Sequence, residues 1–235
     1  MPLVEGEILV LGERAAHHVA RVLRLRSGAP LKIFDGQGHE HEAMLATIDN
    51  PEVTVAVGRE IPATPESPLP VTLAQGIPRG ERMDFILQKA VELGVSCLQP
   101  LWMQRSQSRT RGARQEKRQR HWLGVMISAC EQCGRSTLPG LQAPVDYTTW
   151  LDAGRHTGNR ILLHPEGEHP LGILEPAQGS ILLLVGPEGG ISDDERILAN
   201  RAGFTSARLG PRILRTETAA MAALVCLQTM WGDYR

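Results

Sequence analysis

The first 60 residues contain short runs of alternating hydrophobic and polar positions that predict β-strands. In one run, Val53, Val55 and Val57 alternate with smaller or polar residues, which is the period of a strand with one buried face. Similar runs cover residues 7–11, 31–36 and 42–48. Only residues 15–25 have the apolar spacing of a helix. We therefore predict a small β-barrel or sandwich over residues 1–60.

A proline-rich segment follows, with four prolines in residues 61–70. Because proline fixes φ and lacks a backbone N–H, this segment is predicted to be an extended linker. The chain is therefore divided into a first domain of residues 1–60, the linker, and a second domain of residues 71–235.

From residue 71 the pattern changes to apolar runs that alternate with helical segments. The predicted strands are 71–77, 95–101, 160–164, 180–186 and 206–210, and the predicted helices are 81–94, 114–133, 192–203 and 216–230. Ser192 and Glu195 have the spacing of a capping box, and Gly203 is placed to end that helix. Continuous apolar strands between helices indicate an α/β fold with a parallel sheet covered on both faces.

Composition is that of an ordinary globular protein. Hydrophobic residues make up 42% and charged residues 22% of the chain, enough apolar surface for a core without disulfides. No apolar run approaches the roughly 18 residues of a membrane span, and the start lacks a signal-peptide pattern. Four cysteines are too few for a disulfide framework. We expect a cytoplasmic protein with no membrane partner, and the net charge of −1 excludes a uniformly basic surface.

A glycine-rich loop follows the most apolar of the predicted strands. In LLLVGPEGGISDDE (182–195), the strand ends in Gly-Pro-Glu-Gly-Gly and a capped helix follows. Ligands of open α/β sheets bind outside the carboxyl ends of the strands, and glycines let the backbone approach a ligand closely. The loop matches neither the Walker A nor the GxGxxG pattern. It indicates another kind of ligand site, with a plain strand-to-helix turn as the alternative.

A second strand-to-helix loop, residues 209–220, is rich in charge. Arg212, Arg215 and Glu217 lie near the predicted helix start, where unpaired backbone amides favour anions. Thr216 is a candidate N-cap of that helix. Since His164 ends a third strand, we expect the three strand ends to form one pocket suited to an adenosine-type ligand.

Basic residues are concentrated in residues 105–121, which hold seven Lys and Arg residues and one acid, Glu116. A second cluster in the first domain consists of His17, His18, Arg21, Arg24 and Arg26. Such patches fit contacts to nucleic-acid phosphates, with solvated helix faces as the alternative.

No metal site is predicted from the potential ligands. The pair Cys130 and Cys133 has no second pair at zinc spacing, and His39 and His41 have no obvious third ligand.

Five ordered segments resemble the RsmE-type 16S rRNA uracil-N3 methyltransferases, which are SPOUT-class S-adenosylmethionine enzymes. These segments are 17–25, 88–95, 129–135, 182–192 and 209–220. The resemblance implies a PUA-like β-barrel, a C-terminal α/β domain with a trefoil knot, and a homodimer. It also implies methylation of N3 of a uridine in 16S rRNA of the small ribosomal subunit. The last helix is apolar nearly all round over 219–226, so it is expected to be buried in the core or between subunits.

The same resemblance implies a role for each site residue. Cofactor binding falls to Leu163, His164, Gly186, Pro187, Glu188, Gly189, Gly190, Leu209, Gly210, Ile213, Leu214, Arg215, Thr216 and Thr218. Because uridine N3 carries a proton, the site needs a proton acceptor or cations that stabilise the uridinate. Arg215 is predicted to stabilise that charge, and Glu217 to orient the base or accept its proton. Predicted RNA contacts are His18, Arg21, Arg24, Arg105, Arg109, Arg111, Glu131, Gln132 and Arg135.

Three alternatives stay open: a SPOUT enzyme acting on tRNA or another rRNA nucleotide, a non-catalytic RNA-binding protein of the same fold, and a metal-dependent protein built on the CxxC pair. The chain also departs from the family pattern at its start. Relatives usually carry a basic strand ahead of the segment that opens here at Pro2, which weakens the expectation of RNA binding by the first domain.

Overall fold

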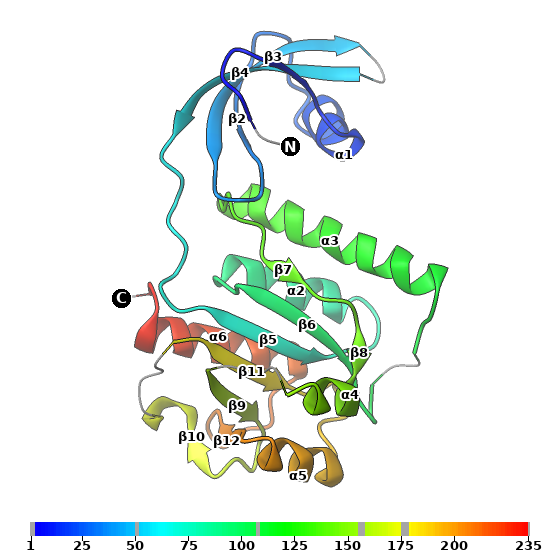
Figure 1. Ribbon diagram of the computed structural model, residues 1–235, viewed down its shortest axis with the longest axis vertical. Coiled ribbons are helices and arrows are strands. Elements are labelled where there is room, and N and C mark those ends of the chain that lie inside the picture. The colour runs from blue at the N-terminus through cyan, green and yellow to red at the C-terminus, as the bar shows by residue number, and fades with distance from the viewer. Residues whose placement is uncertain (1–2, 50–51, 107–108, 155–157, 175–178, 235) are drawn as a thin grey trace. The chain divides into compact units, whose positions relative to one another are not determined.

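The computed structural model describes residues 3–49, 52–106, 109–154, 158–174 and 179–234 (Figure 1). Pro2, where the departure from the family pattern begins, lies outside these residues. The chain divides into two compact units. Unit 1 is Met1–Pro65 with Gly134–Leu138, and unit 2 is Glu66–Cys133 with Pro139–Arg235.

Unit 1 is built on four antiparallel strands in the order β1-β4-β3-β2. Their bounds are β1 Ile8–Val10, β2 Pro30–Phe34, β3 Glu40–Asp49 and β4 Glu52–Ile61. Val53, Val55 and Val57 are buried with exposed fractions of 3%, 0% and 5%, so the predicted alternation is confirmed. They pack with Leu45 and other apolar side chains in the core of this unit. The strands described pair along an open path, with no pairing between β1 and β2.

The predicted helix over 15–25 is shorter and less regular than expected. Helix α1 (Glu13–His17) continues directly into a π-helical turn, η1 (His18–Val22). The turn ends because Arg24 adopts a positive φ of 52°, which a right-handed helix cannot accommodate.

Gly134–Leu138 joins unit 1, although the sequence pattern placed it within the second domain of 71–235. Thr137 forms β-bridges with Gly36 and Gln37, and the backbone N–H of Leu138 donates to the carbonyl of Gly36 at 2.9 Å. Bridges between residues this far apart leave no local period in the sequence, so the pattern could not reveal them.

Unit 2 contains one sheet whose strand pairs are all parallel, as predicted. The strand order is β10-β12-β9-β11-β5-β6-β7, and β8 also pairs with β6. The bounds are β5 Val71–Gly76, β6 Cys97–Trp102, β7 Gly140–Leu141, β8 Val145–Asp146, β9 Asn159–Leu163, β10 His169–Pro170, β11 Ile181–Val185 and β12 Thr205–Arg208.

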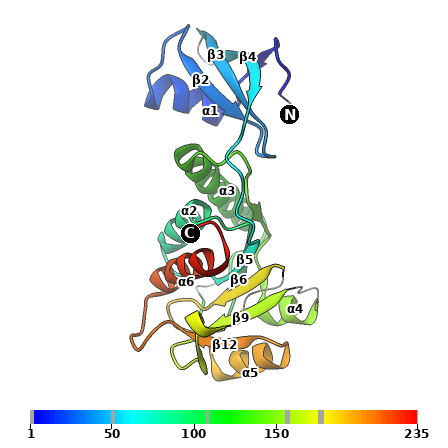
Figure 2. The same cartoon turned by 90° about the vertical axis from the view of Figure 1, so that its left-hand side faces the viewer.

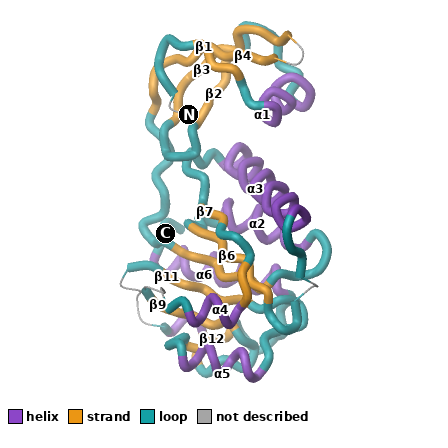
Figure 3. The backbone as a smooth tube through the Cα atoms, turned by 45° about the vertical axis from the view of Figure 1, so that its right-hand side comes forward, coloured by secondary structure: helices purple, strands orange, loops and turns teal. Residues whose placement is uncertain are grey.

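Helices cover both faces of this sheet. They are α2 Arg82–Glu92, α3 Ala113–Cys133, α4 Tyr147–Asp152, α5 Asp193–Arg201 and α6 Thr216–Trp231, with a short 3₁₀ turn, η2 Leu171–Ile173. Figure 2 shows α2 and α6 on one side of the sheet and α4 and α5 on the other, and Figure 3 distinguishes the helices from the strands. Leu182 and Leu184 of β11 pack in one cluster with Trp150 of α4 and Ala199 of α5. The alternate residues of β11 therefore face the opposite helical layer.

The capping box of α5 is present as predicted. The hydroxyl of Ser192 accepts from the backbone N–H of Glu195, and the Glu195 carboxylate accepts from the backbone N–H of Ser192. Among the residues described, no helix has the length and apolar character needed to span a membrane.

Candidate active site

A cavity of about 450 Å³ lies in unit 2 beyond the carboxyl ends of neighbouring parallel strands. Its walls come from the ends of β9 and β11 and from the connection between β12 and α6. These strands are adjacent in the order β12-β9-β11, so their following loops meet at one edge of the sheet. The volume lies within the range of small-molecule and cofactor sites.

Most of the residues predicted for cofactor binding line this cavity. They are Leu163, His164, Gly186, Pro187, Glu188, Gly190, Leu209, Ile213, Leu214, Arg215 and Thr216. Gly189, Gly210 and Thr218 belong to the same segments but are not part of the lining. Glu217 lines the cavity with them.

Close backbone packing shapes the loop after β11. A Cβ on Gly186 would lie 2.6 Å from Cγ1 of Ile191, and Gly190 has a left-handed φ of 74°. The backbone N–H of Gly190 donates to the carbonyl of Pro187 at 2.9 Å, which closes the turn. Glycines are required here because a side chain would collide or strain the backbone.

Thr216 is not the N-cap of α6, which corrects the interpretation from sequence. Arg215 occupies the N-cap position and makes no side-chain capping bond. The hydroxyl of Thr216, which is 5% exposed, instead donates to the carbonyl of Gly186 at 2.6 Å. The threonine therefore joins the start of α6 to the loop after β11.

The charged groups at the start of α6 have unused bonding capacity. Within the described structure, the side chains of Arg212 and Arg215 have no hydrogen bond or ion pair, and both residues line the cavity. Oε2 of Glu217 is buried and has no hydrogen-bond partner. A buried carboxylate oxygen without a donor is costly, so Glu217 is suited to a ligand that brings one.

The surroundings of His164 favour its neutral form. Burial, together with the nearby Arg196 guanidinium, lowers the pKa of His164 below its ordinary value. Its Nδ1 accepts from the backbone N–H of Glu166 at 3.2 Å. In the neutral ring the proton is therefore on Nε2, which makes this nitrogen a hydrogen-bond donor.

Comparisons with known proteins agree with this geometry. The RNA methyltransferase domain family matches residues 65–228, and the RNA methyltransferase PUA domain family matches residues 11–58. Ribosomal RNA small subunit methyltransferase E of Buchnera aphidicola from Acyrthosiphon pisum is 32% identical over 98% of this chain and 91% of its own length. The protein of that name from Mycobacterium tuberculosis is 33% identical over 93% and 85%.

This chain belongs to the ribosomal RNA small subunit methyltransferase E family. Among solved structures, the family member from Neisseria gonorrhoeae bound to S-adenosyl methionine is 38% identical, with a TM-score of 0.92 over 100% of this chain and 97% of that one. A methyltransferase from Legionella pneumophila in complex with the same cofactor is 37% identical, with a TM-score of 0.93 over 99% and 96%. The resemblance identified from the five sequence segments is confirmed.

Sequence reasoning missed five residues that line the cavity of the methyltransferase, namely the apolar Pro165, Val185, Ile191 and Ala219 and the charged Arg82. Arg82 lies at the start of α2 and lines the cavity, and its Nη1 is 3.7 Å from Oε1 of Glu188. The same carboxylate accepts from the backbone N–H of Arg79 at 3.2 Å. The apolar spacing of 81–94 predicts a helix and gives no sign of a site residue, whereas the position of Arg82 after the carboxyl end of β5 is a usable signal.

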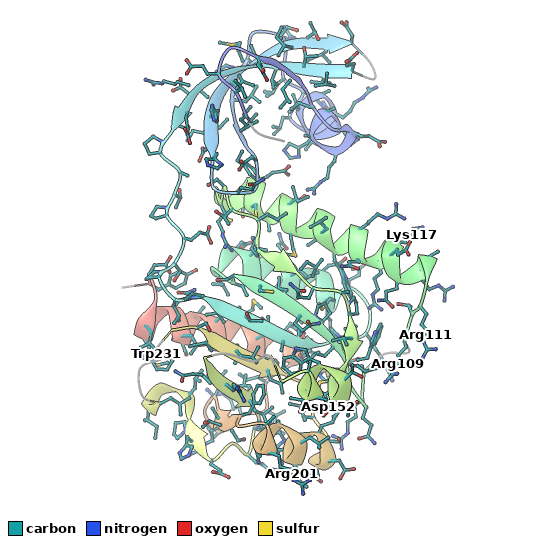
Figure 4. All side chains as sticks on the ribbon, viewed as in Figure 1. Arg109, Arg111, Lys117, Asp152, Arg201 and Trp231 are labelled. Carbon is teal, nitrogen blue, oxygen red and sulfur yellow. The ribbon has the colours of Figure 1, made fainter. Side chains whose placement is uncertain are left out.

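The predicted RNA-contact residues of the basic run are used in different ways. Arg105 lines the cavity, and its Nη1 donates to the carbonyl of Gly189 at 2.9 Å. Arg109 forms a two-point ion pair with Asp146, at 2.9 and 2.6 Å. Figure 4 shows Arg109, Arg111 and Lys117 gathered near the N-terminal end of α3.

The other predicted RNA contacts lie outside the cavity lining. His18 and Arg21 are on η1 and Arg24 follows it, whereas Glu131 and Gln132 are exposed near the end of α3. Arg135 belongs to the segment that joins unit 1. Their roles stay predictions.

The CxxC pair lies inside α3, with Cys130 buried and Cys133 exposed, and neither cysteine forms a disulfide within the described residues. His39 pairs with Asp35 at 2.8 Å, whereas Nδ1 of His41 lies 3.0 Å from the carbonyl of Gly58. The two histidines therefore have separate partners.

Proposed function

We propose that this methyltransferase transfers a methyl group from S-adenosylmethionine to N3 of a specific uridine in 16S rRNA of the small ribosomal subunit. The observation that carries the proposal is the cavity at the ends of β9, β11 and β12, in a chain of this family. It combines apolar walls with charged groups that have bonding capacity left for a ligand.

The residues present fit the cofactor. Leu163, Leu209 and Leu214 offer apolar surface to an adenosine group, and the glycine loop offers main-chain polar atoms. Ile213 lines the cavity with 85% of its surface exposed, so a bound ligand would cover apolar area that now faces solvent. S-adenosylmethionine would supply an electrophilic methyl group in this site.

Glu217 and Arg215 divide the chemistry at uridine between them. Uridine N3 becomes a good nucleophile only when its proton leaves. The buried Oε2 of Glu217 lacks a donor and accepts that proton or orients the N–H. The Arg215 guanidinium, which has no partner within the described residues, stabilises the negative charge that develops on the uracil ring. Much of the rate comes from holding two bound reactants in line.

The RNA is held by basic residues of both units, one of which lines the cavity. Arg105 contacts the RNA at the cavity, and Arg111 contacts it near the N-terminal end of α3. Unit 1 contacts the rRNA backbone through three side chains on or just after η1, namely His18, Arg21 and Arg24. The family's PUA domain supports this role for unit 1.

We extend the proposal to a trefoil knot in unit 2 and a homodimer formed through α6. Full-length likeness to solved family members supports the knot. For the dimer, the apolar helix is not fully covered by its own chain, because Val225 is 39% exposed and Met221, Ala222 and Cys226 are half-buried. A second copy would cover this face.

Nucleoside mass spectrometry tests the function directly. Small ribosomal subunits and naked 16S rRNA, both lacking the modification, are incubated with the protein and S-adenosylmethionine. We expect 3-methyluridine at one position. A different methylated nucleoside would favour another SPOUT reaction. Cofactor binding without any methylation would contradict the assigned substrate, and no cofactor binding would favour a non-catalytic RNA-binding protein.

A further inference from the structure

A chain of buried hydrogen bonds joins three elements behind the cavity. Gln75, near the end of β5, is 0% exposed and is not part of the cavity lining. Its Nε2 donates to Oγ1 of Thr216 at 2.9 Å and to the carbonyl of Gly186 at 3.2 Å. The Thr216 hydroxyl donates in turn to the same Gly186 carbonyl at 2.6 Å.

These bonds connect the two loops that form most of the cavity wall. Gly186 opens the loop after β11, and Thr216 begins α6, 30 residues later in the chain. Gln75 is more than 100 residues from both, at separations of 111 and 141. A single amide from a third strand therefore fixes the spacing between segments that are not neighbours in sequence. Consecutive bonds of this kind polarise and strengthen one another in a buried setting.

Stability alone does not explain a glutamine at this position. Oε1 of Gln75 is buried without a hydrogen-bond partner, although Nε2 also bonds the carbonyl of Gly76 at 2.9 Å. An unsatisfied buried oxygen opposes folding, and buried groups of this kind call for a functional explanation. The contacts of Nε2 provide a functional explanation, because its three acceptors lie at the end of β5, just after β11 and at the start of α6.

We propose that Gln75 is a positioning residue that sets the separation of the two cavity loops and thereby the affinity for the cofactor. It touches neither reactant and acts through Thr216 and Gly186. The inference rests on the proposed function in one respect, namely that the cavity binds S-adenosylmethionine.

The neighbouring strand provides a matched control. Gln99 of β6 is paired with Ala74 in the sheet and is 9% exposed. Its Nε2 donates to the carbonyls of Pro100 and Ala143, at 2.9 and 3.1 Å. Gln99 therefore has the same side chain, a similar burial and similar backbone acceptors, but it bonds neither cavity loop.

The test compares Gln75→Met with Gln99→Met by calorimetric titration of the purified full chain with S-adenosylmethionine, alongside urea unfolding. We expect both variants to lose stability, because each loses buried hydrogen bonds. Only Gln75→Met should bind the cofactor about tenfold more weakly, corresponding to the loss of about one hydrogen bond. In turnover, KM for the cofactor should rise more than kcat falls.

Thr216 provides the second arm, which keeps the proposal testable if Gln75→Met does not fold. Thr216→Val removes the hydroxyl that joins Gln75 to Gly186 and should weaken binding. The double variant of Gln75→Met and Thr216→Val should be no weaker than the worse single variant. If Gln75→Met and Gln99→Met bound the cofactor equally well, or if Thr216→Val bound it as well as the unchanged chain, the inference would be overturned while the proposed function would stand. A wild-type chain that does not bind the cofactor would overturn the proposed function as well.

Discussion

Glu217 is an acid of the cavity lining whose Oε2 is buried and has no hydrogen-bond donor. Glu217→Gln keeps the size of the side chain and removes its basicity. We expect 3-methyluridine formation on small subunits to fall about 100-fold, the usual scale of one general base, while cofactor affinity is unchanged.

Asp194→Asn is the control for that experiment, because Asp194 is an exposed acid in the first turn of α5 and does not line the cavity. It should retain full turnover. If Glu217→Gln were equally active, the proton would have to leave by another route.

His164 gives the site a pH dependence whose sign follows from its lowered pKa. The folded chain favours the neutral ring, so this contribution to stability is present above the unfolded pKa of about 6.5 and is lost as pH falls through the folded value. Protonation would also put a positive charge in the lining of a cavity that would bind a positively charged cofactor. We expect cofactor affinity to weaken from about pH 8 to about pH 5.5 in calorimetric titrations.

His164→Gln should flatten that profile. His169→Gln, which changes an exposed histidine outside the cavity lining, should leave it intact. An unchanged profile in His164→Gln would show that another group titrates in the site.

At the scale of the element, the loop after β11 depends on glycine. In Gly186→Ala the new Cβ would lie 2.6 Å from Cγ1 of Ile191 and 3.2 Å from the carbonyl carbon of Gly190. We expect a loss of about 1–3 kcal/mol in unfolding free energy, typical of overpacking. Cofactor affinity should fall at least about tenfold by calorimetric titration. Gly172→Ala, where a Cβ meets open space, should change neither.

The capping box of α5 should be worth a measurable amount of stability. Ser192→Ala removes the acceptor for the Glu195 backbone N–H and should cost about 1 kcal/mol in urea unfolding. Glu81→Ala is the counterpart, because Glu81 is the N-cap of α2 and makes no capping bond. A loss in Glu81→Ala as large as that in Ser192→Ala would refute the capping explanation.

Elements of three or more residues with a clear apolar pattern could be predicted from sequence, whereas the two-residue strands could not. Strands β5 and β11 are marked by continuous apolar runs, and helix α2 is marked by the helical spacing of its apolar residues. Strands β7 and β8 have two residues each, too few to show any period. Candidate site residues were predicted where a motif marked them, as at Gly186. Gln75 carries no motif and acquires its contacts only when β5, β11 and α6 come together.

At the scale of the whole molecule, the exposed apolar side of α6 tests the proposed homodimer. Val225→Asp places a charge where a second copy would pack, so the protein should sediment as a monomer across a concentration series in analytical ultracentrifugation. Asn200→Asp adds the same charge on the exposed side of α5 and should leave the dimer intact. A Val225→Asp chain that remained dimeric would move the interface away from this face.

The segment Gly134–Leu138 has a consequence for how the two units can be separated into fragments. The backbone passes between the units at three places, after Pro65, Cys133 and Leu138. Cutting the chain at one of these places therefore does not separate the units. A fragment cut to begin at Glu66 would keep a loop whose partners at Gly36 and Gly38 are gone. An isolated catalytic unit should therefore be made by replacing that loop with a short turn as well as by removing the N-terminal residues.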